Sequence, residues 1–160
     1  MGDALGDEFA ERFEGKLQED TAWARRYREY RRTKLAIRDR PFEPTGEYAA
    51  LDRLVAGFAR DNIKVVIVNN PENPLLLKQY EGSPYYRAHV DFLSGLAEKY
   101  SGVRFYNLDH ALPPEDFNDW HHVSFIGTVK LGPRYTDFVQ QAIRDLGAGC
   151  AQGAACSSPQ

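Results

Sequence analysis

Two side chains that can cooperate in proton transfer, Asp119 and His122, stand three residues apart in the second half of the chain. A histidine can serve as general base and then as general acid near neutral pH, because its ordinary pKa is about 6.5. It needs a carboxylate on its second ring nitrogen, which holds one tautomer and stabilises the imidazolium. An aspartate three residues earlier in a turn can supply that bond locally. The spacing therefore makes Asp119 and His122 candidates for a catalytic pair.

The same segment admits two other interpretations. In the simpler one, Asp119 caps the helix expected to start near Ser124, and His122 lies beside it without a catalytic role. In the other, a metal ion is bound by the acids and histidines that gather here, namely Asp109, His110, Asp116, Asp119, His121 and His122. Their spacing matches no known zinc or two-carboxylate signature, so neither a metal nor an organic cofactor is predicted. His121 is expected to be structural, or to be a second-best base.

Helices and strands are expected to alternate around this segment. Apolar residues recur at helical spacing in four stretches, 7–35, 47–61, 85–100 and 124–146, the last interrupted or bent around Gly132-Pro133. Two short and mostly apolar runs, 63–68 and 103–108, are typical of strands, and the first is typical of a strand buried on both faces. The alternation predicts an α/β fold with a parallel sheet and a long N-terminal helix. Two strands make a thin sheet, which indicates that part of a larger fold is missing.

The block that runs from Asp119 to Gly127, Asp-Trp-His-His-Val-Ser-Phe-Ile-Gly, resembles the closing block of the SGNH/GDSL hydrolases. The strand Val65–Val68 leading into Asn-Asn-Pro, the Tyr85-Tyr86 pair and the run Val103–Leu108 are similar to the last strands of such domains. The subgroup that it resembles contains the D-alanyl transfer protein of lipoteichoic-acid biosynthesis and polysaccharide O-acetylation proteins. The resemblance implies a truncated three-layer SGNH-like fold. It divides the chain into an N-terminal helical segment (1–46), the C-terminal half of the domain (47–146) and a disordered tail (147–160).

The departures from that family concern the nucleophile. Its serine block and its oxyanion asparagine lie upstream of the matched region, and the nearest echo, Gly2-Asp3-Ala4-Leu5, has alanine where serine belongs. The resemblance thus implies a partial serine hydrolase or O-acyltransferase domain that acts on esters, with an ester or acylated glycan as the substrate of the intact enzyme. This chain alone is expected to hydrolyse an activated ester no faster than free imidazole. The alternative is a non-catalytic binding or scaffold module that keeps the fold.

Other residues with chemical potential are interpreted more simply. The arginine run from Arg25 to Arg32 is expected to form a solvated helix face with acidic neighbours, and nucleic-acid or anionic-lipid binding through it is the weaker alternative. The tyrosines after the first strand, Tyr80, Tyr85 and Tyr86, are candidates to line a substrate groove or to cover the core. Ser83 is a conceivable nucleophile, but a Gly-Ser-Pro loop does not form a nucleophile elbow.

Composition sets wider bounds. With 160 residues, 42% hydrophobic and 27% charged, the chain suits one folded domain, and its net charge of -3 names no partner. No apolar run approaches the roughly 18 residues of a membrane span, and the acidic start does not look like a signal peptide. The resemblance nevertheless points to a periplasmic or extracellular, membrane-anchored location, so the compartment stays open. Cys150 and Cys156 lie in a tail of small and polar residues and do not indicate the cellular compartment.

Overall fold

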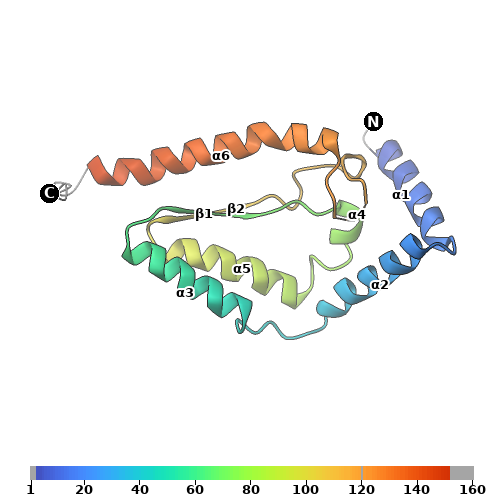
Figure 1. Ribbon diagram of the computed structural model, residues 1–160, viewed down its shortest axis with the longest axis horizontal. Coiled ribbons are helices and arrows are strands. Elements are labelled where there is room, and N and C mark those ends of the chain that lie inside the picture. The colour runs from blue at the N-terminus through green and yellow to red at the C-terminus, as the bar shows by residue number, and fades with distance from the viewer. Residues whose placement is uncertain (1–2, 120, 152–160) are drawn as a thin grey trace.

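A computed structural model describes residues 3–119 and 121–151 (Figure 1). Most of these residues are helical, and two strands form a parallel sheet. The elements in chain order are α1 (Asp3–Gln18), α2 (Ala22–Ile37), α3 (Glu47–Arg60), β1 (Val65–Asn69), α4 (Pro74–Leu77), α5 (Pro84–Lys99), β2 (Val103–Asn107), the 3-10 helix η1 (Pro114–Asp116) and α6 (Phe125–Ala151).

The single long N-terminal helix that was expected is two helices. Thr21 interrupts the pattern with an extended backbone, and its side chain accepts a hydrogen bond from the N–H of Ala24, which caps α2. Arg28 of α2 donates to the carbonyl of Leu17 at the end of α1, so a carbonyl that the ended helix leaves free is satisfied. Phe13 and Tyr27 then meet edge to face across the two helices. The break lets the chain fold back on itself, which helical periodicity alone does not reveal.

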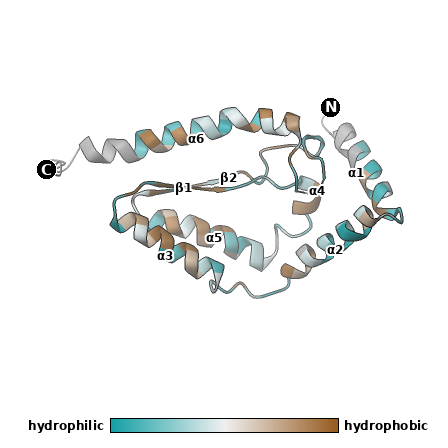
Figure 2. Ribbon diagram, in the orientation of Figure 1, coloured by the Kyte–Doolittle hydropathy of each residue, from teal (hydrophilic) through white to brown (hydrophobic). Residues whose placement is uncertain are grey.

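The predicted parallel pairing of the two strands is confirmed. β1 and β2 run in register from Val65 opposite Val103 to Asn69 opposite Asn107. Helices α3 and α5 lie on one side of the sheet and α6 on the other (Figure 1). Hydrophobic residues lie along both strands and on α3 and α5 (Figure 2). The chain is therefore mixed α/β, but the sheet of the described residues has two strands, and a complete three-layer SGNH sheet is not shown.

The last helix differs from its prediction in two ways. It passes through Pro133 without a break, because Pro133 and Val129 both lie on the exposed side of α6. On this side, water can donate a hydrogen bond to the carbonyl of Val129. Pro133 cannot donate that bond, because proline has no backbone N–H. The helix also continues to Ala151, so the disordered tail predicted for 147–160 does not begin at 147. Residues 152–160 lie outside the described part of the chain.

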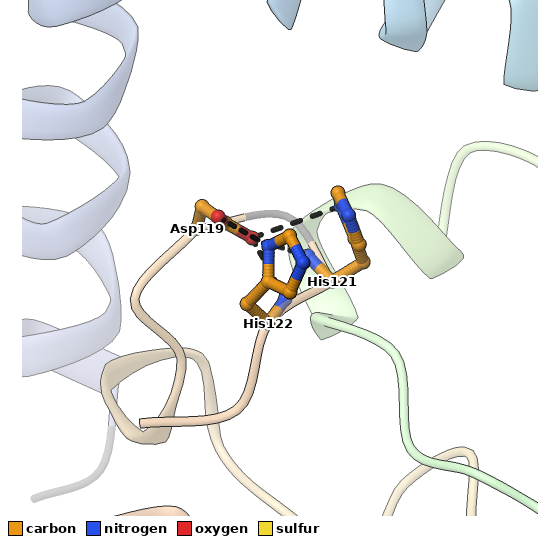
Figure 3. Close-up of side chains that lie close together, drawn as sticks. All are labelled: Asp119, His121 and His122. Atoms are coloured by element: carbon orange, nitrogen blue, oxygen red, sulfur yellow. Dashed lines mark hydrogen bonds and ion pairs between the residues drawn. The ribbon is translucent and has the colours of Figure 1, made fainter. Parts of the chain in front are cut away.

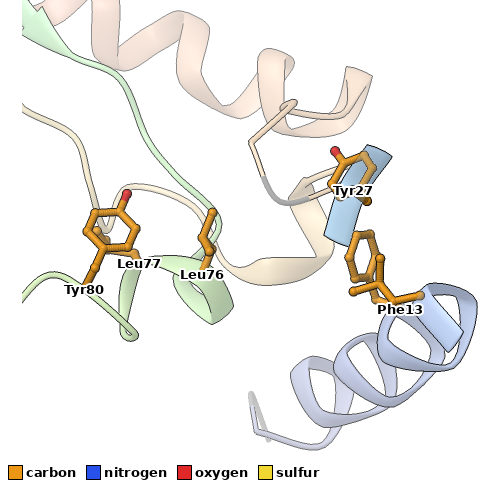
Figure 4. Close-up of a cluster of buried hydrophobic side chains, with 6 residues drawn as sticks. Phe13, Tyr27, Leu76, Leu77 and Tyr80 are labelled. Carbon is orange, nitrogen blue, oxygen red and sulfur yellow. The ribbon is translucent and has the colours of Figure 1, made fainter. Parts of the chain in front are cut away.

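A short helix, α4, was missed in a segment expected to be a loop. Asn73 caps it by accepting a hydrogen bond from the N–H of Leu75 at 2.9 Å, and Pro74 occupies the first helical position. Its leucines, Leu76 and Leu77, are fully buried. They pack with residues of α1 and α2, so this cluster joins the N-terminal helices to the sheet domain (Figure 4). Its members are Phe13, Leu17, Tyr27, Leu76, Leu77 and Tyr80.

The basic run of α2 is largely occupied by contacts within the molecule. Arg25 pairs with Asp20, Arg32 pairs with Glu29, and Arg31 reaches Glu14 of α1 at 2.9 Å. These pairs lie on a hydrated surface, where each contributes little to stability.

Among the described residues, none of the helices combines the length and the apolar character that crossing a membrane requires.

The loop that carries Asp119 is anchored where it joins α6. Ser124 donates its N–H to the carbonyl of Asp116 at 2.8 Å, and the buried carboxylate of Asp116 pairs with Lys130 of α6 at 2.7 Å. Gly127 lies against this junction so closely that a Cβ there would stand 2.4 Å from the Asp116 carbonyl and 2.6 Å from Val123. Glycine at this position therefore meets a steric requirement of the loop–helix joint.

We predict that Gly127→Ala destabilises the protein by about 1–3 kcal/mol, because the added methyl group must displace backbone. Urea unfolding followed by circular dichroism measures the change. The matched control is Gly95→Ala in α5, where a Cβ would meet nothing within 4 Å. That control is expected to be neutral or stabilising by up to about 1 kcal/mol. Equal effects of the two substitutions would contradict the close approach at Gly127.

Candidate functional site

The structure brings Asp119 and His122 together. The ring nitrogen Nδ1 of His122 lies 2.7 Å from Oδ2 of Asp119 (Figure 3). The other carboxylate oxygen, Oδ1, accepts hydrogen bonds from the backbone N–H groups of His121 at 2.9 Å and His122 at 2.7 Å. One oxygen thus holds the turn while the other holds the imidazole. The pairing is produced within four consecutive residues.

The surrounding backbone keeps this turn in place. Phe117 and Val123 form an antiparallel bridge on either side of it, and Asn118 donates its N–H to the carbonyl of His122 at 2.8 Å. From α4, the buried Asn73 donates through Nδ2 to the backbone carbonyl of Asp119 at 3.2 Å. The turn is therefore tied both to its own flanks and to the segment that comes after β1.

The two side chains of the pair differ in exposure. The side chain of Asp119 is 14% exposed, whereas that of His122 is 66% exposed. Because Nδ1 is bound to the carboxylate, Nε2 is the nitrogen that an incoming molecule can reach. This is the arrangement that a general base requires: one ring nitrogen oriented by an acid and the other open to the reacting group.

The carboxylate of Asp119 stays ionised more readily than an ordinary aspartate. Burial alone would raise its pKa, but hydrogen bonds from the Tyr27 hydroxyl, from the backbone of His121 and His122 and from the His122 ring outweigh burial. The pKa of Asp119 consequently lies below its ordinary value. Near neutral pH the group is a carboxylate, which suits it to hold a proton on Nδ1 and to stabilise an imidazolium.

His121, expected to be structural or a second base, lies between this pair and α2. Its ring stacks on Tyr30 with the centroids 4.5 Å apart, and its Nδ1 is 3.7 Å from Oδ1 of Asp119. Tyr27 and Tyr30 belong to the stretch 7–35, whose apolar residues recur at helical spacing and form a stripe. The structure shows that the same stripe also covers one side of the turn, a role that only the tertiary packing of α2 determines.

Of the six residues considered as metal ligands, the structure brings three together. Asp119, His121 and His122 each offer a ligand atom, and these atoms lie within 4.8 Å of one another. Such a carboxylate and two imidazoles could serve as ligands of a zinc-like ion. The other three have different contacts: Asp116 pairs with Lys130, His110 with Glu81 at 3.1 Å, and Asp109 lies at the end of β2.

A second polar cluster lies where the two strands end, and sequence reasoning did not identify it. Asn69 donates to Asn107 at 3.1 Å and to Asp109 at 2.8 Å, and Tyr86 also donates to Asp109. The signal available in the sequence was an asparagine at the carboxyl end of each parallel strand. The three tyrosines that were candidates to line a groove or to cover the core, Tyr80, Tyr85 and Tyr86, line a cavity beside this cluster. Tyr80 and Tyr86 also pack in the hydrophobic cluster that contains Leu76 and Leu77. Ser83 is not displayed as a nucleophile, because its hydroxyl caps α5 by accepting from the N–H of Tyr86.

Comparisons with known proteins identify relatives without naming an activity. A protein-family model, whose description states no function, matches residues 3–144. A protein of Leptospira interrogans serogroup Icterohaemorrhagiae serovar Lai, named "Uncharacterized protein", is 35% identical over 104 residues. That match covers 65% of this chain and 19% of the relative, so the chain spans about a fifth of the length of the relative. No solved structure matches the chain.

These matches overturn the resemblance to SGNH/GDSL hydrolases, and that prediction is wrong. The matching model extends over the N-terminal helices as well as the α/β part, and neither it nor the relative is described as a hydrolase. The resemblance misled because the block from Asp119 to Gly127 is a local structure. Its acid binds two neighbouring N–H groups and the ring three residues on, and its glycine is required by close contacts with Asp116 and Val123. The chain belongs to the family whose model matches residues 3–144, and the matches point away from the SGNH/GDSL hydrolases.

Proposed function

We propose that Asp119 and His122 are the carboxylate–imidazole pair of a general acid–base site that transfers acyl groups of esters. The observation that carries the proposal is the 2.7 Å contact between Asp119 Oδ2 and His122 Nδ1 on a ring that is largely exposed. The lowered pKa of Asp119 supports it. The geometry supports the acid–base part of the proposal without reference to any family.

The reaction assigns one role to each group. Nε2 of His122 takes the proton of an attacking hydroxyl while that oxygen bonds to the ester carbonyl carbon. The imidazolium then gives the proton to the departing alkoxide oxygen as its bond to carbon breaks. Asp119 holds the proton on Nδ1 throughout and stabilises the imidazolium, so it is not itself protonated. An ester is the substrate class that we propose, with the attacking hydroxyl supplied from outside the described residues.

The second candidate is a binding or scaffold module that carries out no reaction. This candidate is favoured by two serine hydroxyls, both of which accept hydrogen bonds from backbone N–H groups at the start of a helix. Ser83 caps α5, and Ser124 accepts a hydrogen bond from the N–H of Gly127 at 3.1 Å, which caps α6. Both hydroxyls accept a hydrogen bond at the start of a helix, which favours a structural role for the two serines.

The first test concerns the tautomer of His122. With Asp119 in place, neutral His122 is expected to carry its proton on Nδ1, which long-range ¹H–¹⁵N correlation spectra report directly. In Asp119→Asn the carboxylate no longer selects that tautomer, and the ring is expected to shift toward protonation on Nε2. Asp137→Asn on the exposed side of α6 is the control and should leave the spectrum of His122 unchanged. A His122 tautomer insensitive to Asp119→Asn would remove the basis of the proposal.

The second test is the reaction itself. In the native protein isolated with its bound partners, His122→Ala is expected to lower acetyl transfer from p-nitrophenyl acetate by about 10²–10⁴-fold. His110→Ala is the matched control, because His110 is exposed and pairs with Glu81 on another loop. The isolated 160-residue chain is expected to react no faster than free imidazole. Equal rates for the native protein and His122→Ala would favour the binding module.

The third test uses the pKa of Asp119, which is lowered from 3.8. A lowered pKa in the folded state stabilises the protein at pH values above the unfolded pKa, and that stabilisation disappears as the pH falls through the folded value. Wild type should therefore exceed Asp119→Asn in urea stability at about pH 6, and the difference should shrink below about pH 4. A difference that widens on acidification would show that the carboxylate is not stabilised in its ionised form.

A further inference from the structure

A cavity of about 180 Å³ lies beside the carboxyl end of β1, between the first residues of α3 and α5 and the end of α2. It is distinct from the Asp119–His122 pair, because the described residues of its lining include neither Asp119 nor His122. The volume is below the roughly 300–1,000 Å³ of pockets for drug-sized molecules, so a compact chemical group is the occupant that it fits. The residues that give it its character are Tyr48, Glu72, Tyr80, Tyr85, Tyr86 and Asp109.

Two carboxylates give the cavity its charge. Asp109 is 5% exposed and accepts hydrogen bonds from Asn69, Asn107 and Tyr86, which hold it in one position. Glu72 accepts a hydrogen bond from the Tyr80 hydroxyl. The one guanidinium in the lining, Arg38, is exposed and pairs with Asp39 at 3.3 Å. The lining therefore favours a positive charge inside the cavity.

Aromatic rings form the walls. The rings of Tyr80 and Tyr86 meet at 78° with centroids 5.2 Å apart, and those of Tyr48 and His89 meet at 69°. Each pair is thus packed edge to face, and all four residues line the cavity. The phenols stay neutral, because burial first and hydrogen bonding second raise the pKa of both Tyr48 and Tyr86. A neutral ring has a negative face, which attracts a cation within about 6 Å.

We propose that this cavity binds a small organic cation, such as a methylated ammonium group. Aromatic walls and hydrogen-bonded carboxylates are the combination that recognises such a group, by cation–π attraction and by charge. A bare divalent metal ion fits less well, because it would need oxygen ligands in place of aromatic faces. The proposal stands apart from the acyl-transfer proposal, since no residue of the Asp119–His122 pair takes part in it.

The experiment compares a cation with a neutral molecule of the same shape. Choline and its uncharged carbon analogue 3,3-dimethylbutan-1-ol are titrated into the full chain by calorimetry, with methyl glucoside as a third probe. Choline is expected to bind at least about tenfold more tightly than the neutral analogue. Glu72→Gln is expected to weaken choline binding about tenfold, while Glu98→Gln on the exposed end of α5 has no effect.

Tyr85 provides a second pair of variants that separates ring from hydroxyl. Tyr85→Phe keeps the aromatic face and should retain choline binding. Tyr85→Ala removes the aromatic face and should weaken choline binding about threefold to tenfold. Thermal melts show that each variant is folded. The His122→Ala variant should bind choline like wild type. Failure of the acyl-transfer proposal can therefore be distinguished from failure of the cation-binding proposal. Equal affinity for the neutral analogue, preference for the glucoside, no choline binding, or indifference to Glu72→Gln would each overturn the proposal.

Discussion

The parallel pairing of β1 with β2 is the constraint on which the arrangement of polar groups depends. Because both strands point the same way, both end at one edge of the sheet, with Asn69 opposite Asn107. The two segments that leave this edge carry the carboxylates of both proposed sites. One leads through Glu72 to α4, and the other leads through Asp109 to the turn at Asp119. Both the cavity and the acid–base pair thus take their carboxylates from the segments beyond the strand ends.

The sequence predicted well the features that depend on local physics. The bounds of α3, α5 and both strands agree with apolar periodicity and with β-branched runs, and the structure places them within two residues of expectation. The contact between Asp119 and His122 was also predictable, because an aspartate that accepts N–H bonds from the next residues brings its second oxygen to the ring three residues on.

The features that the sequence did not reveal depend on tertiary contacts or on single capping residues. One threonine, Thr21, divides the N-terminal helix, although the apolar stripe continues across it. Helix α4 is too short for a periodicity signal and owes its existence to the Asn73 cap and two buried leucines. The cavity is lined by residues from separate elements, so no spacing in the sequence predicts it. The SGNH/GDSL resemblance was wrong for a related reason. The Asp119–His122 contact forms within a single turn, and such a local contact says little about the family to which the whole chain belongs.

The two-stranded sheet of the described residues also bears on how the chain reaches its native state. Such a sheet is marginally stable on its own, so β1 and β2 take their stability from the helices on either side. The chain between Val65 and Val103 contains α4 and α5, so pairing the two strands closes a long loop. The chain entropy lost in closing it is recovered only when the helices pack. Strand pairing is therefore expected to be a late event, with α5 helical before the two strands find their register.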